Sequence, residues 1–164
     1  MTTGEQRSAG SMNPDQPFQM LIKDHDFVRQ LFNRYLNTQD IEVKQEAGPR
    51  ILSLLEMHTA LEEAAFYPRV HHIDPALVDS CEQEHNEVRR MIEQLRGMDP
   101  GDPQCDRMFQ QLSDAVIQHV QKEEQQLFPK IESAGIDMTE LGLQLQAAEA
   151  NMVSDQARAT ERRV

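Results

Sequence analysis

The sequence predicts an all-α protein, a four-helix bundle with up-down-up-down order. Apolar residues recur at three- and four-residue steps through four long segments, which is the spacing of one helix face. Short stretches that contain Gly or Pro separate these segments, and short connections favour antiparallel neighbours. A pattern of histidine and glutamate also occurs twice, about 60 residues apart, so the chain consists of two copies of one helix hairpin.

Each of the four helices has a recognisable start and stop. Proline suits the first turn of a helix, where its missing N–H is not needed, and aspartate caps the turn before it. These signals place the four starts at Pro17, Asp40, Pro75 and Pro103. The expected stops are Asn37, Pro68 with the stretch 71–74, Gly97, and the stretch from Pro129, which kinks or ends the fourth helix, to Gly135. Gly48-Pro49 should kink the second helix or make it begin afresh.

The predicted domain organisation is one bundle domain, residues 17–153, between two irregular ends. Residues 1–16 are polar without apolar periodicity and are expected to form a disordered leader. A short fifth helix is expected from about Thr139 to Met152. Residues 154–164 are expected to be a frayed tail.

Charge and composition narrow the expected partners. A formal net charge of −12 argues against nucleic acid or an anionic membrane as a partner. No apolar run approaches the roughly 20 residues that a membrane span needs. Two cysteines without a CxxC motif suit a reducing compartment, so the expected location is cytoplasmic. The expected state is a monomer or a weak homo-oligomer.

Histidines stand in the apolar stripes where aliphatic residues would otherwise lie. Each has core apolar residues three or four positions away: His25, His58, His85 and His119. A buried polar group without a partner costs about 1–3 kcal/mol or more. Four imidazoles and two carboxylates in one small core therefore need a common partner, which a pair of metal ions provides.

The glutamates complete this predicted metal site. Residues four apart lie on one helix face, so His58 with Glu62, and His119 with Glu123, can reach one metal cluster. The next residues, Glu63 and Glu124, point off that face and are expected to be outer or surface groups. Nitrogen and oxygen ligands suit iron, manganese or zinc, and open positions with bridging carboxylates favour iron.

Several residues near the predicted ligands have two alternative roles. Cys81 is a small buried hydrophobe or has a role near the metals. Tyr35 and Tyr67 are core-edge residues or place a phenol beside a metal-bound oxygen species. The acids that flank the histidines are exposed surface groups or orient an imidazole N–H, namely Asp24, Asp26 and Glu84.

The chain has the layout H…HxxxE…H…HxxxE and the segments HTALEEAAFYP (58–68) and HVQKEEQQLFP (119–129). In these motifs it resembles the hemerythrin-like family, also called HHE cation-binding domains. The resemblance covers about residues 18–150. It implies a bundle that holds two non-heme iron ions, joined by an oxo or hydroxo bridge and by two carboxylates, for which zinc or manganese can substitute. The implied metal ligands are His25, His58, Glu62, His85, His119 and Glu123.

The sequence departs from the oxygen-carrying hemerythrins at two places. Those proteins have HxxxH on the third helix, where this chain has Cys81 before His85. They have HxxxxD on the fourth, which leaves open whether Glu123 or Glu124 binds; the four-residue spacing favours Glu123. One protein ligand fewer leaves more positions for O2, peroxide or nitric oxide. We therefore expect reactivity with such small ligands, including catalase-like turnover, and keep a metal- or oxygen-sensing or iron-handling regulatory module without turnover as the alternative. A purely structural metal ranks third.

Overall fold

A computed structural model describes residues 15–162, and among these residues all regular structure is helical. Four long helices form the body: α1 (Pro17–Leu36), α2 (Ile41–Leu61), α4 (Pro75–Leu95) and α5 (Pro103–Lys122). Two π-helical segments continue α2 and α5, η1 (Glu62–Phe66) and η2 (Glu123–Leu127), and each leads into a short helix, α3 (Tyr67–Val70) or α6 (Phe128–Ser133). The last helix is α7 (Met138–Glu161).

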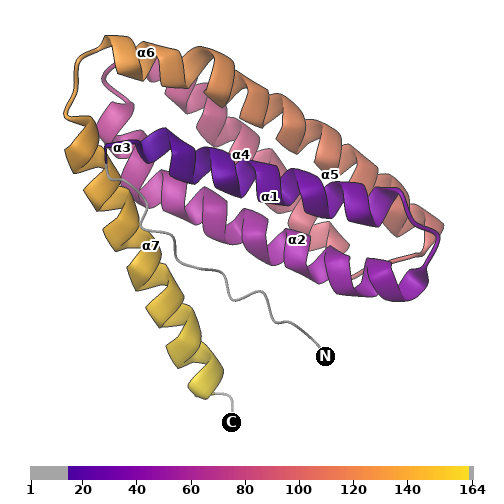
Figure 1. Cartoon of the computed structure of the whole chain (residues 1–164). Coiled ribbons are helices and arrows are strands. Elements are labelled where there is room, and N and C mark those ends of the chain that lie inside the picture. Colours follow the sequence, from indigo (N-terminus) through magenta and orange to yellow (C-terminus); the bar gives the residue numbers. More distant parts are fainter. Residues whose placement is uncertain (1–14, 163–164) are drawn as a thin grey trace.

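The long helices lie side by side, with α1 against α2 and α5, and α4 against α5 and α2 (Figure 1). At one end of this body, α7 packs on η1, α1 and α2 and then leaves the body at an angle (Figure 1). No helix in residues 15–162 is long and apolar enough to cross a membrane.

The four helix starts lie where the sequence predicts them; Pro17 lies in the first turn of α1, and the other three starts have aspartate caps. The Asp40 side chain accepts the backbone N–H of Glu42 at 2.9 Å. The same kind of cap begins α4, α5 and α7, through Asp74, Asp102 and Asp137. Each cap satisfies a backbone donor that the first helical turn leaves free.

The second helix does not begin afresh at Gly48-Pro49, because α2 runs unbroken from Ile41 to Leu61. A Cβ at position 48 would lie 3.3 Å from the Phe109 ring and 3.5 Å from the Tyr35 ring. Glycine here allows α5 and α1 to approach closely, and this packing outweighs the local cost of Pro49 inside the helix.

The second helix ends at the stretch 71–74, as predicted, but the prediction that Pro68 already ends it is wrong, because the chain stays helical to Val70. The N–H of Tyr67 bonds to the carbonyl of Glu62, and that of Phe128 to Glu123, five residues back in each case. A proline ring clashes with the carbonyl four residues before it in a regular α-helix. The wider π turn just before Pro68 and Pro129 lets the helix continue.

The fifth helix is longer than predicted. It runs 24 residues, from Met138 to Glu161, and only Leu141, Gly142 and Leu145 on it are buried. Residues 154–161, which the sequence assigns to a frayed tail, are helical and exposed. Of the predicted leader, residues 1–14 lie outside the described residues.

Two separate apolar clusters fill the interior. One includes Phe32, Ile51, Ile92 and Leu112, and the other includes Phe66, Val78, Leu127 and Leu145. Along α1, His25 stands between Leu21 of the second cluster and Val28 of the first. The other three stripe histidines stand at the same boundary on their own helices, which places one layer of polar side chains between two apolar ones.

Candidate metal centre

Six buried side chains meet in this polar layer. Glu62 and Glu123 are fully buried, and the histidines are at most 8% exposed. Each of the four long helical segments contributes, since α1 and α4 supply one histidine each, while α2 with η1 and α5 with η2 supply a histidine and a glutamate each. All six residues that the sequence predicts as ligands are therefore brought together in one place.

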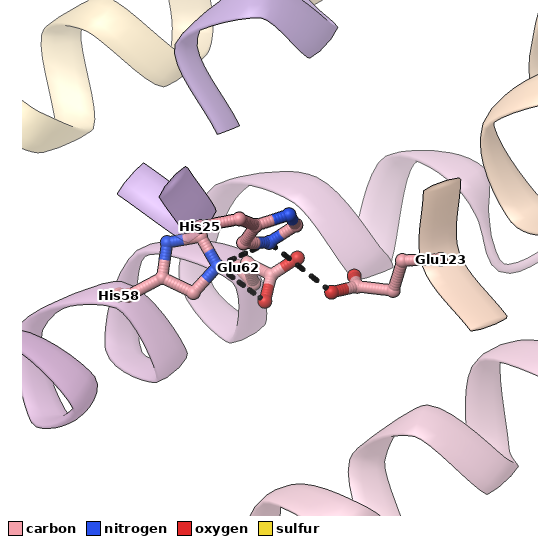
Figure 2. Close-up of side chains that lie close together, drawn as sticks. All are labelled: His25, His58, Glu62 and Glu123. Atoms are coloured by element: carbon pink, nitrogen blue, oxygen red, sulfur yellow. Dashed lines mark hydrogen bonds and ion pairs between the residues drawn. The ribbon is translucent and has the colours of Figure 1, made fainter. Parts of the chain in front are cut away.

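The four imidazoles form two facing pairs. The Nε2 atoms of His25 and His58 lie 3.0 Å apart (Figure 2). The Nε2 atoms of His85 and His119 lie 3.1 Å apart. Each pair consists of the two histidines of one hairpin, so each hairpin provides one pair of ligand nitrogens.

The two glutamates connect the pairs. Glu62 Oε1 lies 3.0 Å from His58 Nε2 and 3.3 Å from His85 Nε2. Glu123 Oε1 lies 3.0 Å from His119 Nε2 and 3.6 Å from His25 Nε2. Figure 2 shows both carboxylates beside the His25–His58 pair. Each carboxylate thus contacts one imidazole of each pair, as a bridging ligand must.

Hydrogen bonds do not satisfy this cluster. In the described part of the chain, both oxygens of Glu62 and Oε1 of Glu123 are buried without a hydrogen-bond partner. Buried carboxylates without partners are costly unless they pair with cations or coordinate metals. The ligand atoms of His25, His58, Glu62 and Glu123 lie within 4.8 Å of one another, as do those of Glu62, His85 and His119. The residues present therefore fit a pair of metal ions.

The protonation of this cluster is strained without a cation. Burial and the neighbouring Glu62 raise the pKa of Glu123 to about 8. Burial and the neighbouring His58 lower the pKa of His25 to about 4. Burial opposes the charge on His58, but Glu62 and Asp24 outweigh it and raise its pKa to about 10. The pKa of His119, the equivalent of His58, is raised in the same way by Glu123 against the effect of burial. The two equivalent glutamates are driven apart, because His58 lowers the pKa of Glu62 against the effect of burial, while the pKa of Glu123 rises.

A second layer of carboxylates lies behind the imidazoles. An acidic side chain approaches the Nδ1 atom of every site histidine, at 3.0–3.4 Å: Glu124 at His25, Asp24 at His58, Glu63 at His85 and Glu84 at His119. The contacts at His25, His58 and His119 are hydrogen bonds, and such a bond at Nδ1 fixes the tautomer that leaves Nε2 free to bind a metal. The contact at His85 has ion-pair distance without a hydrogen bond. Asp24 and Glu84 are therefore placed to orient an imidazole N–H. Asp26 instead pairs with Arg29 at the surface.

The second glutamate of each EE pair reaches across to the other hairpin. Glu124, in the second hairpin, meets His25 of the first, and Arg29 donates to its other oxygen at 3.2 Å. Glu63, in the first hairpin, meets His85 of the second, and Arg89 donates to it. Of the two alternatives at the end of α5, Glu123 lies inside the cluster and Glu124 lies outside it.

Tyr67 also lies in the site, where the sequence placed it only as the second of two alternatives and the helix phase did not predict it. Its side chain is fully buried, and its hydroxyl lies 3.1 Å from His85 Nε2 and 3.1 Å from Glu123 Oε2. The only signal in the sequence is that FYP in the first copy becomes LFP in the second. Cys81 is also buried, which raises its pKa to about 12, and it groups with Glu84 and His119.

Comparisons with known proteins agree with this geometry. A curated relative named DNA nickase, from Nostoc sp. (strain PCC 7120), is 32% identical over 130 residues. The match covers 78% of this chain but only 37% of the relative's own length. No solved structure matches the chain. The profile of the hemerythrin HHE cation-binding domain matches residues 16–155. The chain therefore belongs to the hemerythrin HHE cation-binding domain family.

Proposed function

We propose that this chain holds two non-heme iron ions between its hairpins and binds or turns over O2, peroxide or nitric oxide there. The observation that carries the proposal is the pair of buried carboxylates, each placed between the two imidazole pairs. Iron in this site would supply the redox chemistry, and zinc or manganese remain possible occupants. The up-down-up-down order of the helices, which brings both hairpins to one layer, is part of the proposal.

The proposed roles follow from the positions of the side chains. His25 and His58 would hold one ion and His85 and His119 the other, and the carboxylates of Glu62 and Glu123 would serve both. The two carboxylates repel each other and attract cations, so bound cations would turn this repulsion into attraction. The outer carboxylates orient the imidazoles, and the apolar clusters above and below keep bulk water away.

Burial supports a small ligand. Because the six side chains are at most 8% exposed, only a molecule of a few atoms has a plausible route to the metal layer without opening the bundle. A diatomic molecule or a peroxide meets this condition, and a large organic substrate does not. Catalase-like turnover of peroxide is the form of enzyme activity that this proposal includes.

A sensing or iron-handling role without turnover is the second candidate, and the position of α7 favours it. This helix packs on η1, the segment that begins with Glu62, and then continues to Glu161 with an exposed surface. A change in the position of η1 on binding a metal or gas would therefore change the packing of α7. In that case the readout is the position of α7 rather than a product.

The nicking activity in the relative's name is not part of the function proposed for this chain. The chain spans 37% of that protein, and a net charge of −12 opposes contact with phosphates. We propose that the chain has no nucleic-acid or membrane partner, that it works in the cytoplasm, and that it is a monomer or weak homo-oligomer.

The test is metal analysis together with an optical spectrum, repeated after adding peroxide and nitric oxide. His58→Ala should halve the metal content or abolish the spectrum, because it removes a nitrogen ligand and the neighbour of Glu62. His71→Ala is the matched control, since His71 is 44% exposed and pairs with Asp79 away from the cluster. Unchanged metal and spectrum in His58→Ala would show that the ligand assignment is wrong.

The two candidate functions separate in a second measurement. Turnover predicts that the iron-loaded wild type consumes peroxide catalytically and that His58→Ala does not. Sensing predicts no turnover, but a metal-dependent change in hydrogen exchange along α7. If metal removal leaves exchange in α7 unchanged, the sensing role is contradicted.

A further inference from the structure

The two copies of the hairpin differ chemically at one position inside the site. Tyr67 and Phe128 are equivalent, because each is the first residue after a π segment and each precedes a proline. Both are buried beside the equivalent histidine. The Phe128 ring is parallel to His25 with centroids 6.3 Å apart, and the Tyr67 ring lies 5.2 Å from His85. One imidazole pair therefore has a phenol beside it, and the other has an apolar ring.

The phenol oxygen lies among the metal-facing atoms, not behind them. It is 3.1 Å from His85 Nε2, 3.5 Å from His119 Nε2 and 3.1 Å from Glu123 Oε2. Two ligand atoms bound at a right angle to one ion, each at about 2.1 Å, lie about 3.0 Å apart. The His85–His119 separation of 3.1 Å is of this kind. The phenol oxygen thus has the spacing of a further ligand in the same set.

Hydrogen bonding alone does not account for this position. A phenol carries one proton, so it can donate to only one of these three neighbours. Its contact with Glu123 uses that proton, and its contacts with the two Nε2 atoms then need protons on nitrogens that also face each other. A cation among these four atoms satisfies all of them at once.

We propose that Tyr67 is a metal ligand through its phenol oxygen, on the ion held by His85 and His119. This inference rests on the proposed two-metal site. Cys81, at the position where the oxygen carriers have another histidine, falls in a separate group with Glu84 and His119. The extra ligand atom is thus a phenol oxygen from the first residue of α3, and the two ions would differ, because Phe128 offers the other ion no ligand atom.

The test uses the colour of iron(III) phenolate. The chain has two tyrosines, so Tyr35→Phe is a matched control that removes the other buried phenol, whose hydroxyl bonds to Asp106 instead. Iron-loaded, oxidised wild type and Tyr35→Phe should show a visible phenolate-to-iron band. Tyr67→Phe should lose the band completely, while keeping its helical circular dichroism and at least the iron of the His25–His58 pair.

Resonance Raman spectra of the wild type provide a measurement that needs no variant. Excitation in the visible band should enhance phenolate ring modes, and these modes should shift when the tyrosines carry ring deuterium. Iron-loaded wild type without such modes, or Tyr67→Phe with an unchanged band, contradicts Tyr67 as a ligand and leaves the two-metal site intact. A wild type that takes up no metal contradicts the proposed function and this inference with it.

Discussion

Each site imidazole uses both of its ring nitrogens. Nε2 faces the buried carboxylates, while Nδ1 faces an outer carboxylate that is partly exposed and, in three of the four cases, also held by a basic side chain. The outer contact sets the tautomer and the ring orientation, and the carboxylate raises the basicity of the ligand nitrogen. Glu63 and Glu124 do this across the two hairpins, which gives the repeated EE pair one inner and one outer role.

We expect Glu124→Ala to weaken metal binding by about 10- to 100-fold, the usual effect of losing an outer partner of a metal-binding histidine. The inner ligands stay in place, so the number of metal ions at saturation should not change. Competition with a chelator of known affinity measures the effect. Asp26→Ala is the control, because Asp26 pairs with the same Arg29 but is 57% exposed and contacts no site histidine. Equal affinities in the two variants would contradict the orienting role.

A second residue-scale network lies at the far end of the bundle. The hydroxyl of the buried Tyr35 donates to Asp106 Oδ1, and Lys44 Nζ donates to Asp106 Oδ2, both at 2.8 Å. Burial acts to raise the pKa of Asp106, but these two donors outweigh it and hold that pKa below its ordinary value of 3.8. The carboxylate therefore stabilises the fold when it is ionised.

The sign of the pH dependence follows. A lowered folded-state pKa gives stability that is present above the unfolded value and is lost as pH falls through the folded one. We expect Asp106→Asn to reduce the free energy of unfolding by about 1–3 kcal/mol near neutral pH. The difference from wild type should shrink as pH falls below about 4. Denaturant titrations of the metal-free proteins across this range measure it, and a difference independent of pH would contradict the assignment.

At the scale of elements, the sequence predicts helix starts better than helix ends. The starts depend on aspartate and proline signals that act within one turn, so Pro17, Asp40, Pro75 and Pro103 are all placed correctly. The stretch 71–74 does end the second helix, but Pro68 does not, because a proline terminates an α turn but not a π turn. The length of α7 is also missed, since a helix with three buried residues has little apolar periodicity to read.

The π segments also explain which part of the candidate site was predictable. Four-residue spacing on an α-helix places Glu62 with His58 and Glu123 with His119, and both pairs lie in the cluster. The same α-helical phase turns Tyr67, five residues after Glu62, well away from that face. A π turn is wider, so residue i+5 lies nearer the face of residue i. The phenol therefore enters the site only because of a backbone feature that no local sequence rule predicted.

At the scale of the whole molecule, the metal layer joins the two hairpins. Every inner glutamate contacts imidazoles from both hairpins, and the layer separates two apolar clusters that do not depend on it. Metal binding at this layer would therefore also stabilise the packing of one hairpin on the other. Without cations the layer contributes less to docking, because burial and the neighbouring Glu62 raise the pKa of Glu123 to about 8 and so favour its uncharged form near neutral pH.

Metal removal should therefore destabilise the wild type. A ligand at about 1,000 times its Kd stabilises the folded state by about 4 kcal/mol, which for a chain of this length shifts Tm by on the order of 10 °C. Calorimetry with and without a chelator measures this loss. The double variant Glu62→Gln/Glu123→Gln keeps the shape of the layer but removes its charge. Its Tm should not respond to the chelator, because the amides no longer supply the negative charge that holds the cations. A wild type whose Tm is insensitive to the chelator, or a double variant whose Tm falls on chelation as much as that of the wild type, would show that metal binding at these carboxylates does not hold the hairpins together.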